Sequence, residues 1–375
     1  MSKPRLWTRN FIAIFSSSFF LYLGYMMLHL LLPVHMNRLG ADDTTVGLAM
    51  ALFMLSGLII RPFAGAALDH WGRRPLLLIT MASTLLLTLA YSRVGITGII
   101  IIHFLQGFSW AAAATSVTTI VSDQLPKSIY GMGFGVFSLS TSLPLGLGPL
   151  LALALFEGRG FGILTLVAAG LTGIAILFIP LLQYPRQPES KLLRIRGSLI
   201  EKCALIPSVT VLICNIPYGA VSGFVILHGE EQGILRIGVY FTVFALVFMT
   251  TRPFFGRLVD RIGYPKLLYP GLALIAAGMV LLGLRPEYYL LNASLYAIGD
   301  SAIQSSLNTL AITRADPQRL GAANATFYTG FDAGVGLGSI LGGALASALG
   351  YGPMFLVMAA MPVLAGLVAV VGLRE

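Results

Sequence analysis

The sequence predicts an all-α membrane protein of twelve transmembrane helices, arranged as two pseudo-symmetric bundles of six. Of the 375 residues, 57% are hydrophobic and only 10% are charged, whereas a soluble domain carries about 25% charged residues. The apolar residues form twelve runs, each close to the roughly 20 residues that a helix needs to cross a bilayer. A motif that begins at Arg61 also returns at Arg252, which indicates an internal repeat.

The twelve expected spans are apolar runs separated by short polar or turn segments. In chain order they cover 10–34, 45–69, 76–93, 96–120, 131–156, 160–183, 204–228, 236–259, 267–284, 288–313, 321–349 and 352–373. Continuous apolar runs favour helices over the alternating pattern of a β-barrel, because lipid leaves each backbone group to be bonded within the protein. The first run is too long for the apolar region of a cleaved signal peptide, so we expect it to remain in the protein.

The distribution of basic residues predicts the orientation. Seventeen of the 24 Lys and Arg residues fall in segments that face the cytoplasm if the N-terminus does, five fall on the other side and two lie deep in spans. Because cytoplasmic segments are enriched in Lys and Arg, we expect a multi-pass protein of the cell (inner) membrane with both termini in the cytoplasm. This bias explains the net charge of +9 without a nucleic-acid partner. It is compatible with contacts to acidic membrane lipids.

Several classes of chemistry find no support in the sequence. The two cysteines, Cys203 and Cys214, lie at or in the seventh span and suggest neither a disulfide framework nor a metal site. There is no Walker-type Gly-rich loop, no HExxH sequence and no soluble domain large enough to hydrolyse ATP. We therefore expect no enzyme activity, no metal and no cofactor. Any energy that the protein uses must come from a gradient.

The internal repeat divides the chain into two halves. "RPFAGAALDHWGRRP" (61–75) returns as "RPFFGRLVDRIGYPK" (252–266), and "GMGFGVFSLSTSLPLGLGPLL" (131–151) aligns with "GAANATFYTGFDAGVGLGSIL" (321–341). We expect six-helix bundles at 1–182 and 204–375, joined by a polar and basic cytoplasmic linker at 183–203. Parallel halves of this kind are typical of secondary transporters.

The loop after the second span resembles the signature of the major facilitator superfamily, Gly-x-x-x-Asp-x-x-Gly-Arg-Arg/Lys. The matching residues are Gly65, Asp69, Gly72, Arg73 and Arg74. The second copy keeps Gly256, Asp260 and Gly263 but has Tyr264 and Pro265 in place of the basic pair. The resemblance covers essentially the whole chain and implies the major facilitator fold.

In this family the signature loop closes the cytoplasmic side of the protein. The resemblance therefore implies that Asp69 and Arg73 form a gate contact, with Asp123 at the inner end of the fourth span as a further partner of Arg73. The alternative is that these charges only set the topology and the shape of the loop.

Two further family patterns are incomplete. In the fourth span, Arg-x-x-Gln-Gly keeps Gln106 and Gly107 but has His103 in place of arginine. Because histidine titrates near neutral pH and arginine stays charged, His103 is either a protonation switch or a neutral hydrogen-bonded residue. The fifth span carries Gly135, Gly148 and Pro149, but it has Pro144 and Leu153 at the two positions where the antiporter-associated pattern has glycine.

Ionisable residues inside a span are costly and are candidates for function by default. Those that we single out are Arg61, Arg252, Asp300, Asp332, His29 and His103. Arg61 and Asp332 lie at similar depth, and the second and eleventh helices face each other in this family, so we expect the two to pair. Asp332, Asp300 and His103 are the candidates for the coupled proton.

Arg252 occupies the position of Arg61 in the repeat, but the counterpart of Asp332 is Ser142. Three explanations stay open. Asp300 in the same half neutralises Arg252, the guanidinium binds an anionic group of the substrate, or water satisfies it.

Polar and aromatic residues of the first, fourth, seventh and tenth spans are the candidate contacts of a substrate cavity: Tyr25, His29, Gln106, Trp110, Asn215, Tyr218, Gln304 and Asn308. Asp300, Gln304 and Asn308 recur every four residues and so share one helix face. They either contact the ligand or hydrogen-bond between helices.

The function expected from the resemblance is secondary active transport, with proton-coupled efflux (antiport) of a small organic solute by alternating access. Its partners would be the solute, protons and membrane lipids, and it would work as a monomer. A proton-coupled importer (symporter) is the first alternative. A membrane receptor or lipid carrier that keeps the fold without transporting a solute is the second.

Overall fold

The computed structural model describes residues 6–41, 43–183, 199–234 and 236–372. Most of the predicted linker at 183–203 therefore lies outside the described residues. Within these ranges the chain is helical and contains no β-strand, which confirms the predicted all-α class. The chain packs as two compact units, and each is described by itself below.

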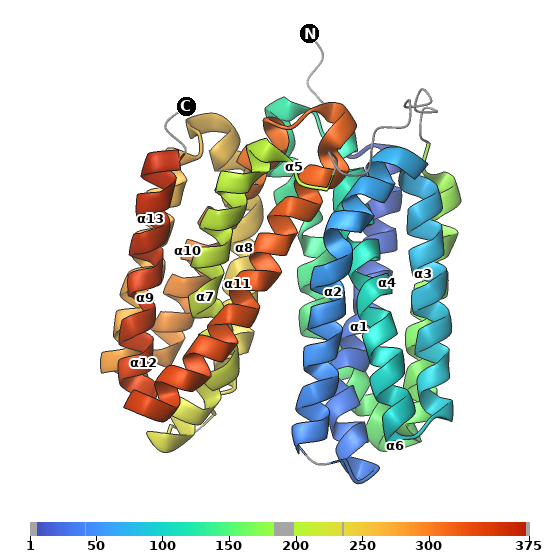
Figure 1. The fold of residues 1–375 in the computed structure, drawn as a ribbon, viewed down its shortest axis with the longest axis horizontal. Coiled ribbons are helices and arrows are strands. Elements are labelled where there is room, and N and C mark those ends of the chain that lie inside the picture. Colours follow the sequence, from blue (N-terminus) through green and yellow to red (C-terminus); the bar gives the residue numbers. More distant parts are fainter. Residues whose placement is uncertain (1–5, 42, 184–198, 235, 373–375) are drawn as a thin grey trace. The chain divides into compact units, whose positions relative to one another are not determined.

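Unit 1 comprises Met1–Leu125, Leu139–Ile200 and Asp316–Ala325. Its helices are α1 (Arg9–Arg38), α2 (Asp43–Trp71), α3 (Arg73–Ala90), α4 (Ile96–Gln124) and α6 (Leu139–Leu177). As Figure 1 shows, they form a bundle in which α1 packs along α6, α2 along α4, and α3 against both α4 and α6.

Unit 2 comprises Pro126–Ser138, Glu201–Ala315 and Thr326–Glu375. Its helices are α5 (Tyr130–Phe137), α7 (Lys202–Glu231), α8 (Val239–Ile262), α9 (Pro265–Leu284), α10 (Tyr289–Thr313), most of α11 (Leu320–Leu349), α12 (Tyr351–Met358) and α13 (Ala360–Gly372). Within this bundle α10 packs against α7, α8 and α9, while α5 packs against α8. Two short segments thus belong to a different unit from the residues that flank them in the sequence. They are α5, which belongs to unit 2, and the first turn of α11, which belongs to unit 1.

Ten helices in the described part of the chain are long and apolar enough to cross a membrane. The twelve predicted spans all fall on helical segments, so the structure is consistent with the predicted count. The span at 131–156 is divided at Ser138 between α5 and α6, and the span at 288–313, which is α10, is made less apolar by its polar side chains.

Two breaks in the helices have local causes. Gly160 has φ 79° and ψ 173°, a conformation open to glycine, and it divides α6 into segments that match two predicted spans. The last span is divided at Ala359 into α12 and α13. Pro362 lies three residues later, and its ring lacks the N–H that a continuous helix would use there.

Close packing of α2 on α4 depends on Gly107. A Cβ atom at this position would collide with the Ser56 hydroxyl and with the backbone of Phe53, whereas a Cβ at Gly170, in α6, would meet nothing within 4 Å. The backbones of α2 and α4 therefore approach each other at a point where only glycine fits.

We expect Gly107→Val to destabilise unit 1 by about 1–3 kcal/mol, because the added side chain forces the two helices apart. Thermal unfolding of the purified protein in detergent would measure this. The control is Gly170→Val, which brings the same β-branched residue into a helix at an open position. Equal unfolding temperatures for the two variants would contradict the close contact.

Candidate functional site

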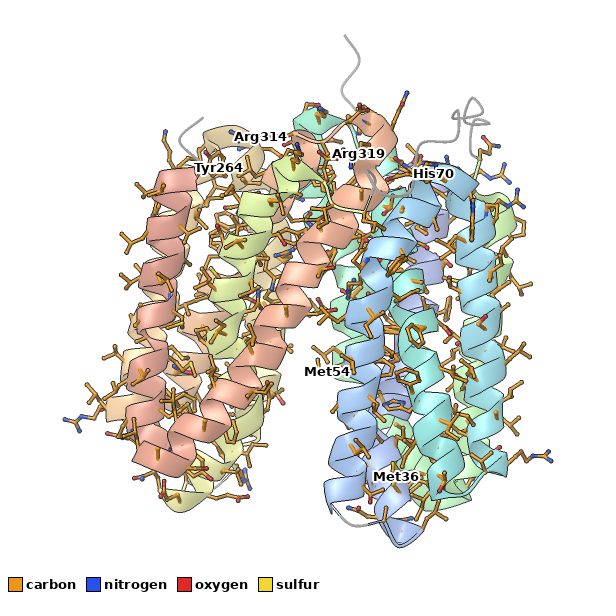
Figure 2. The ribbon with its side chains drawn as sticks, viewed as in Figure 1. Met36, Met54, His70, Tyr264, Arg314 and Arg319 are labelled. Carbon is orange, nitrogen blue, oxygen red and sulfur yellow. The ribbon has the colours of Figure 1, made fainter. Side chains whose placement is uncertain are left out.

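The residues of the family signature lie at one end of unit 1. Figure 2 shows His70 near this end, on the last turn of α2, and Met36 near the opposite end, on α1. Gly72, between α2 and α3, has φ 92°. This left-handed conformation suits glycine and allows the sharp turn between the two helices.

Arg73 binds two carboxylates at the end of unit 1. Its Nη1 lies 2.9 Å from an Asp69 oxygen, and its Nε lies 2.9 Å from an Asp123 oxygen. Nη1 also donates to the Leu68 carbonyl at 2.6 Å. The side chain is almost completely buried, at 2% exposure. The guanidinium fork suits this role, because it presents several donors in fixed directions.

Asp69 also binds the first turn of α11, which belongs to unit 1. Its two oxygens accept hydrogen bonds from the backbone N–H groups of Gly321 at 3.0 Å and Ala322 at 2.9 Å. Such N–H groups have no partner inside the helix, and a negative charge is favourable beside them. Gly65 permits the approach, since a Cβ there would lie 2.6 Å from the Gly321 oxygen.

Unit 2 repeats this arrangement without the arginine. Asp260, on the last turn of α8, accepts from the backbone N–H groups of Gly131 and Met132 at 2.8 Å each, in the first turn of α5. Tyr264 occupies the position of Arg73, and Asp260 forms no ion pair with any described residue. Both helix-capping contacts were missed from the sequence. The two aligned repeats held the signal, since each pairs an aspartate in one motif with a glycine in the other.

The charged residues deep in the spans fall in both units. Arg61 is 8% exposed on α2 and donates to the Thr115 hydroxyl on α4 at 3.4 Å. Asp332 is partly buried on the part of α11 that belongs to unit 2. The predicted pair of Arg61 with Asp332 would join residues of different units and stays a prediction.

In unit 2, Arg252 and Asp300 are buried but do not form an ion pair with each other. Asp300 instead accepts from Gln304, one turn later on α10, at 2.8 Å. Arg252 donates to the Ser301 carbonyl at 3.5 Å, and its guanidinium lies 5.5 Å from the Phe248 ring centre. Direct neutralisation of Arg252 by Asp300 is therefore not the arrangement observed, because the carboxylate is held by its own helix.

The other candidates in unit 2 bond partly within helices and partly between them. Asn215 donates to the Val211 carbonyl on its own helix at 2.8 Å. Asn308 accepts from the Tyr130 hydroxyl on α5 at 3.4 Å. The ring of Tyr218 lies 5.7 Å from that of Phe244, between ring centres. Of the polar stripe on α10, Asp300 and Gln304 thus bond to each other, and Asn308 bonds between helices.

In unit 1 the structure brings five candidates into one cluster: Tyr25, His29, His103, Gln106 and Trp110. The rings of Tyr25 and Trp110 stack with centres 3.6 Å apart, and those of Tyr25 and His29 with centres 4.9 Å apart. Tyr91 joins the cluster, with its hydroxyl 2.7 Å from Nδ1 of His103 and bonded to Gln106. Sequence reasoning missed Tyr91 and Phe53, since a single aromatic residue in an apolar span gives no spacing signal.

We expect Arg73→Ala to cost about 3–5 kcal/mol of stability, because it leaves two carboxylates without their shared cation. Arg73→Lys should lie between this variant and wild type, because one ammonium cannot reproduce the fork. Thermal unfolding in detergent is the measurement. The control is Arg74→Ala, the exposed neighbour, whose loss should change stability by less than about 0.5 kcal/mol. An unfolding temperature for Arg73→Ala equal to that of Arg74→Ala would contradict the assignment.

Comparisons with known proteins agree with this fold. The family model described as Major Facilitator Superfamily matches residues 14–234 and 208–375. The staphylopine export protein of Staphylococcus aureus is 21% identical over 290 residues, which is 74% of this chain and 73% of that protein. The multidrug resistance protein MdtG of Salmonella arizonae is 27% identical over 379 residues, which is 95% of this chain and 93% of that protein.

A solved structure shows the same fold at low sequence identity. The human organic anion transporter MFSD10 (TETRAN) superimposes with a TM-score of 0.84 at 17% identity, covering 98% of this chain and 100% of that one. Since the family model spans both halves, the chain belongs to the major facilitator superfamily and is a multi-pass membrane transporter rather than an enzyme.

Proposed function

We propose that the protein is a proton-coupled exporter that exchanges protons for a small organic solute by alternating access. It works as a monomer in the cell (inner) membrane, surrounded by lipid, with both termini in the cytoplasm. The bias of basic residues toward the segments on one side supports this orientation.

The main support for the proposal is the buried environment of the Asp300 carboxylate. This carboxylate is 6% exposed within α10 and is hydrogen-bonded to Gln304, and it forms no ion pair with a cation among the described residues. A buried carboxylate without a paired cation is destabilised by the loss of water, and binding a proton removes that cost. Asp300 is therefore suited to exchange a proton during transport.

Asp332 is the other carboxylate in the proposal and its first candidate for the coupled proton. Like Asp300, it is a carboxylate inside a membrane span, where an ionisable residue is a candidate for function by default. Asp300 and Asp332 thus offer two routes to the same coupling, and the experiment below distinguishes them.

The export direction is supported by the relatives. One is named as an export protein and another as a multidrug resistance protein. The fold also occurs in the fucose:proton symporter FucP of E. coli, with a TM-score of 0.81 at 14% identity, so the fold itself is compatible with import. Proton-coupled import is therefore the alternative that the experiment must separate.

The Asp69 cluster is proposed to act as the gate on the cytoplasmic side. The support is that one carboxylate binds both Arg73 and the first turn of α11. Release of that turn would expose two unbonded N–H groups and would remove both backbone donors from the Asp69 carboxylate. The contact is made of groups that water can replace.

Reconstituted vesicles with a trapped pH dye and an acidic interior test the function. When a panel of organic anions, cations and zwitterions is added outside, an antiporter releases protons and the interior becomes more alkaline. A symporter carries protons inward with the solute, so the dye would move in the opposite direction. Solute-triggered alkalinisation is the result that we expect of wild type.

The coupling residue is found by substitution. We expect either Asp300→Asn or Asp332→Asn to lose the dye response while keeping exchange of labelled for unlabelled solute, because solute binding does not need the proton. The control is Glu287→Gln, an exposed residue whose only described ion pair is with Arg285, and this variant should behave as wild type. A normal dye response in both aspartate variants would contradict coupling through these carboxylates.

A further inference from the structure

Two histidines from different helices lie beside each other inside unit 1. His29 is on α1 and His103 is on α4, and their ring centres are 5.8 Å apart with 26° between the planes. His103 is 1% exposed. Aromatic rings enclose the pair: the Phe53 ring centre lies 4.5 Å from that of His103 and 5.4 Å from that of His29.

The hydrogen bonds around His103 assign its tautomer. The Tyr91 hydroxyl donates its single hydrogen to the Gln106 side-chain oxygen, while the Gln106 nitrogen donates to Thr88 at 3.2 Å. The same hydroxyl lies 2.7 Å from Nδ1 of His103 and must accept there, so Nδ1 carries the hydrogen. The lone pair of the neutral ring is then on Nε2.

Both imidazoles keep one nitrogen without a protein partner. Nε2 of His103 and Nδ1 of His29 are buried, and neither has a hydrogen-bond partner among the described residues. A basic nitrogen in an aromatic enclosure loses its bonds to water, which is a cost that a bound ligand would remove. The other nitrogen of His103 is already held in place by Tyr91, as is usual for a histidine that binds a metal.

The separation of the rings limits what can bind both nitrogens. A direct N–H···N hydrogen bond between two imidazoles needs ring centres within about 5.3 Å, so the observed 5.8 Å is too long for a shared proton. Two imidazoles on one metal ion, with metal–nitrogen bonds of about 2.1 Å, can have centres up to about 6.6 Å apart. The observed separation lies within this limit.

We propose that His29 and His103 bind a divalent first-row transition-metal ion, through Nδ1 and Nε2 respectively. Imidazole suits zinc, copper or nickel and does not suit magnesium or calcium. No third histidine, cysteine or carboxylate joins the pair within the described ranges. The ion therefore keeps open coordination positions, which water or a chelating organic ligand can fill. Tyr91, Gln106 and Thr88 are positioning residues, because they orient His103 without touching the ion.

Metal titration of the purified protein tests the proposal without any transport assay. The full chain is prepared without a polyhistidine tag, and cobalt(II) is added while its visible absorption is followed; zinc is then used to displace it. We expect one ion per chain. His29→Gln and His103→Gln should each weaken binding at least tenfold, because each removes a ligand. X-ray absorption of the zinc-loaded wild type should show imidazole nitrogen ligands.

Three further variants make the test specific. Tyr91→Phe should weaken binding about 10–100-fold, since it removes the bond that orients His103 but leaves both ligands. His35→Gln should bind as wild type, because His35 lies at the far end of α1 and stacks on Phe161 at 3.7 Å between ring centres. A Cys203→Ser, Cys214→Ser double variant should also bind as wild type. That result would exclude the two thiols as ligands of the metal ion.

The proposal would be overturned by three results. They are no binding to wild type, binding that survives loss of both histidines, and an absorption spectrum without imidazole ligands. Unchanged affinity in Tyr91→Phe would overturn the role of the Tyr91 bond. Because the wild-type spectrum does not depend on any variant, the test holds even if a histidine variant fails to fold.

Discussion

The guanidinium of Arg73 holds two carboxylates at once, and the structure of one end of unit 1 depends on it. Through Asp69 and Asp123 it connects α2, α3 and α4. It also keeps Asp69 in the position from which that side chain binds the first turn of α11. Because the charge of a buried carboxylate is costly unless it is matched, the cation stabilises Asp69 in the position from which it anchors the helix.

In unit 2 an aspartate also binds the backbone N–H groups at the start of a helix, but without an arginine beside it. Asp260 binds two amides of α5, but Tyr264 stands where an arginine would reach it. Among the described residues, Asp69 thus binds a cation and two amides, whereas Asp260 binds two amides and no cation. The pseudo-symmetry of the sequence therefore produces equivalent geometry with unequal charge.

Much of this architecture follows from the sequence. The twelve spans follow from length and hydropathy, and the repeat identifies Asp69, Arg73 and their counterparts. Asp123 was placed beside Arg73 through the resemblance to the family. The features that the sequence did not predict depend on contacts between distant segments. The amides of Gly321 and Ala322 carry no side-chain signal, and the packing of α5 in unit 2 and of the first turn of α11 in unit 1 cannot be read from periodicity.

Charged and polar residues inside the spans were recognised, but their partners were harder to predict. Neutralisation of Arg252 by Asp300 was one of three open explanations, but Asp300 bonds to Gln304, which lies one turn away on the same helix. His103 was recognised as a departure from the family pattern. Its bond to Tyr91 could not be foreseen, since it depends on where the end of α3 lies beside α4.

Hydrogen exchange at the first turn of α11 would test the central claim most directly. The amides of Gly321 and Ala322 should exchange slowly in the wild type and much faster in Asp69→Asn, while Arg73→Lys should give intermediate rates. The amides of Gly131 and Met132, which bind Asp260, serve as the internal control and should not change. If Gly321 and Ala322 exchange equally slowly in Asp69→Asn and in the wild type, Asp69 does not anchor α11, and the account given for this end of unit 1 is wrong.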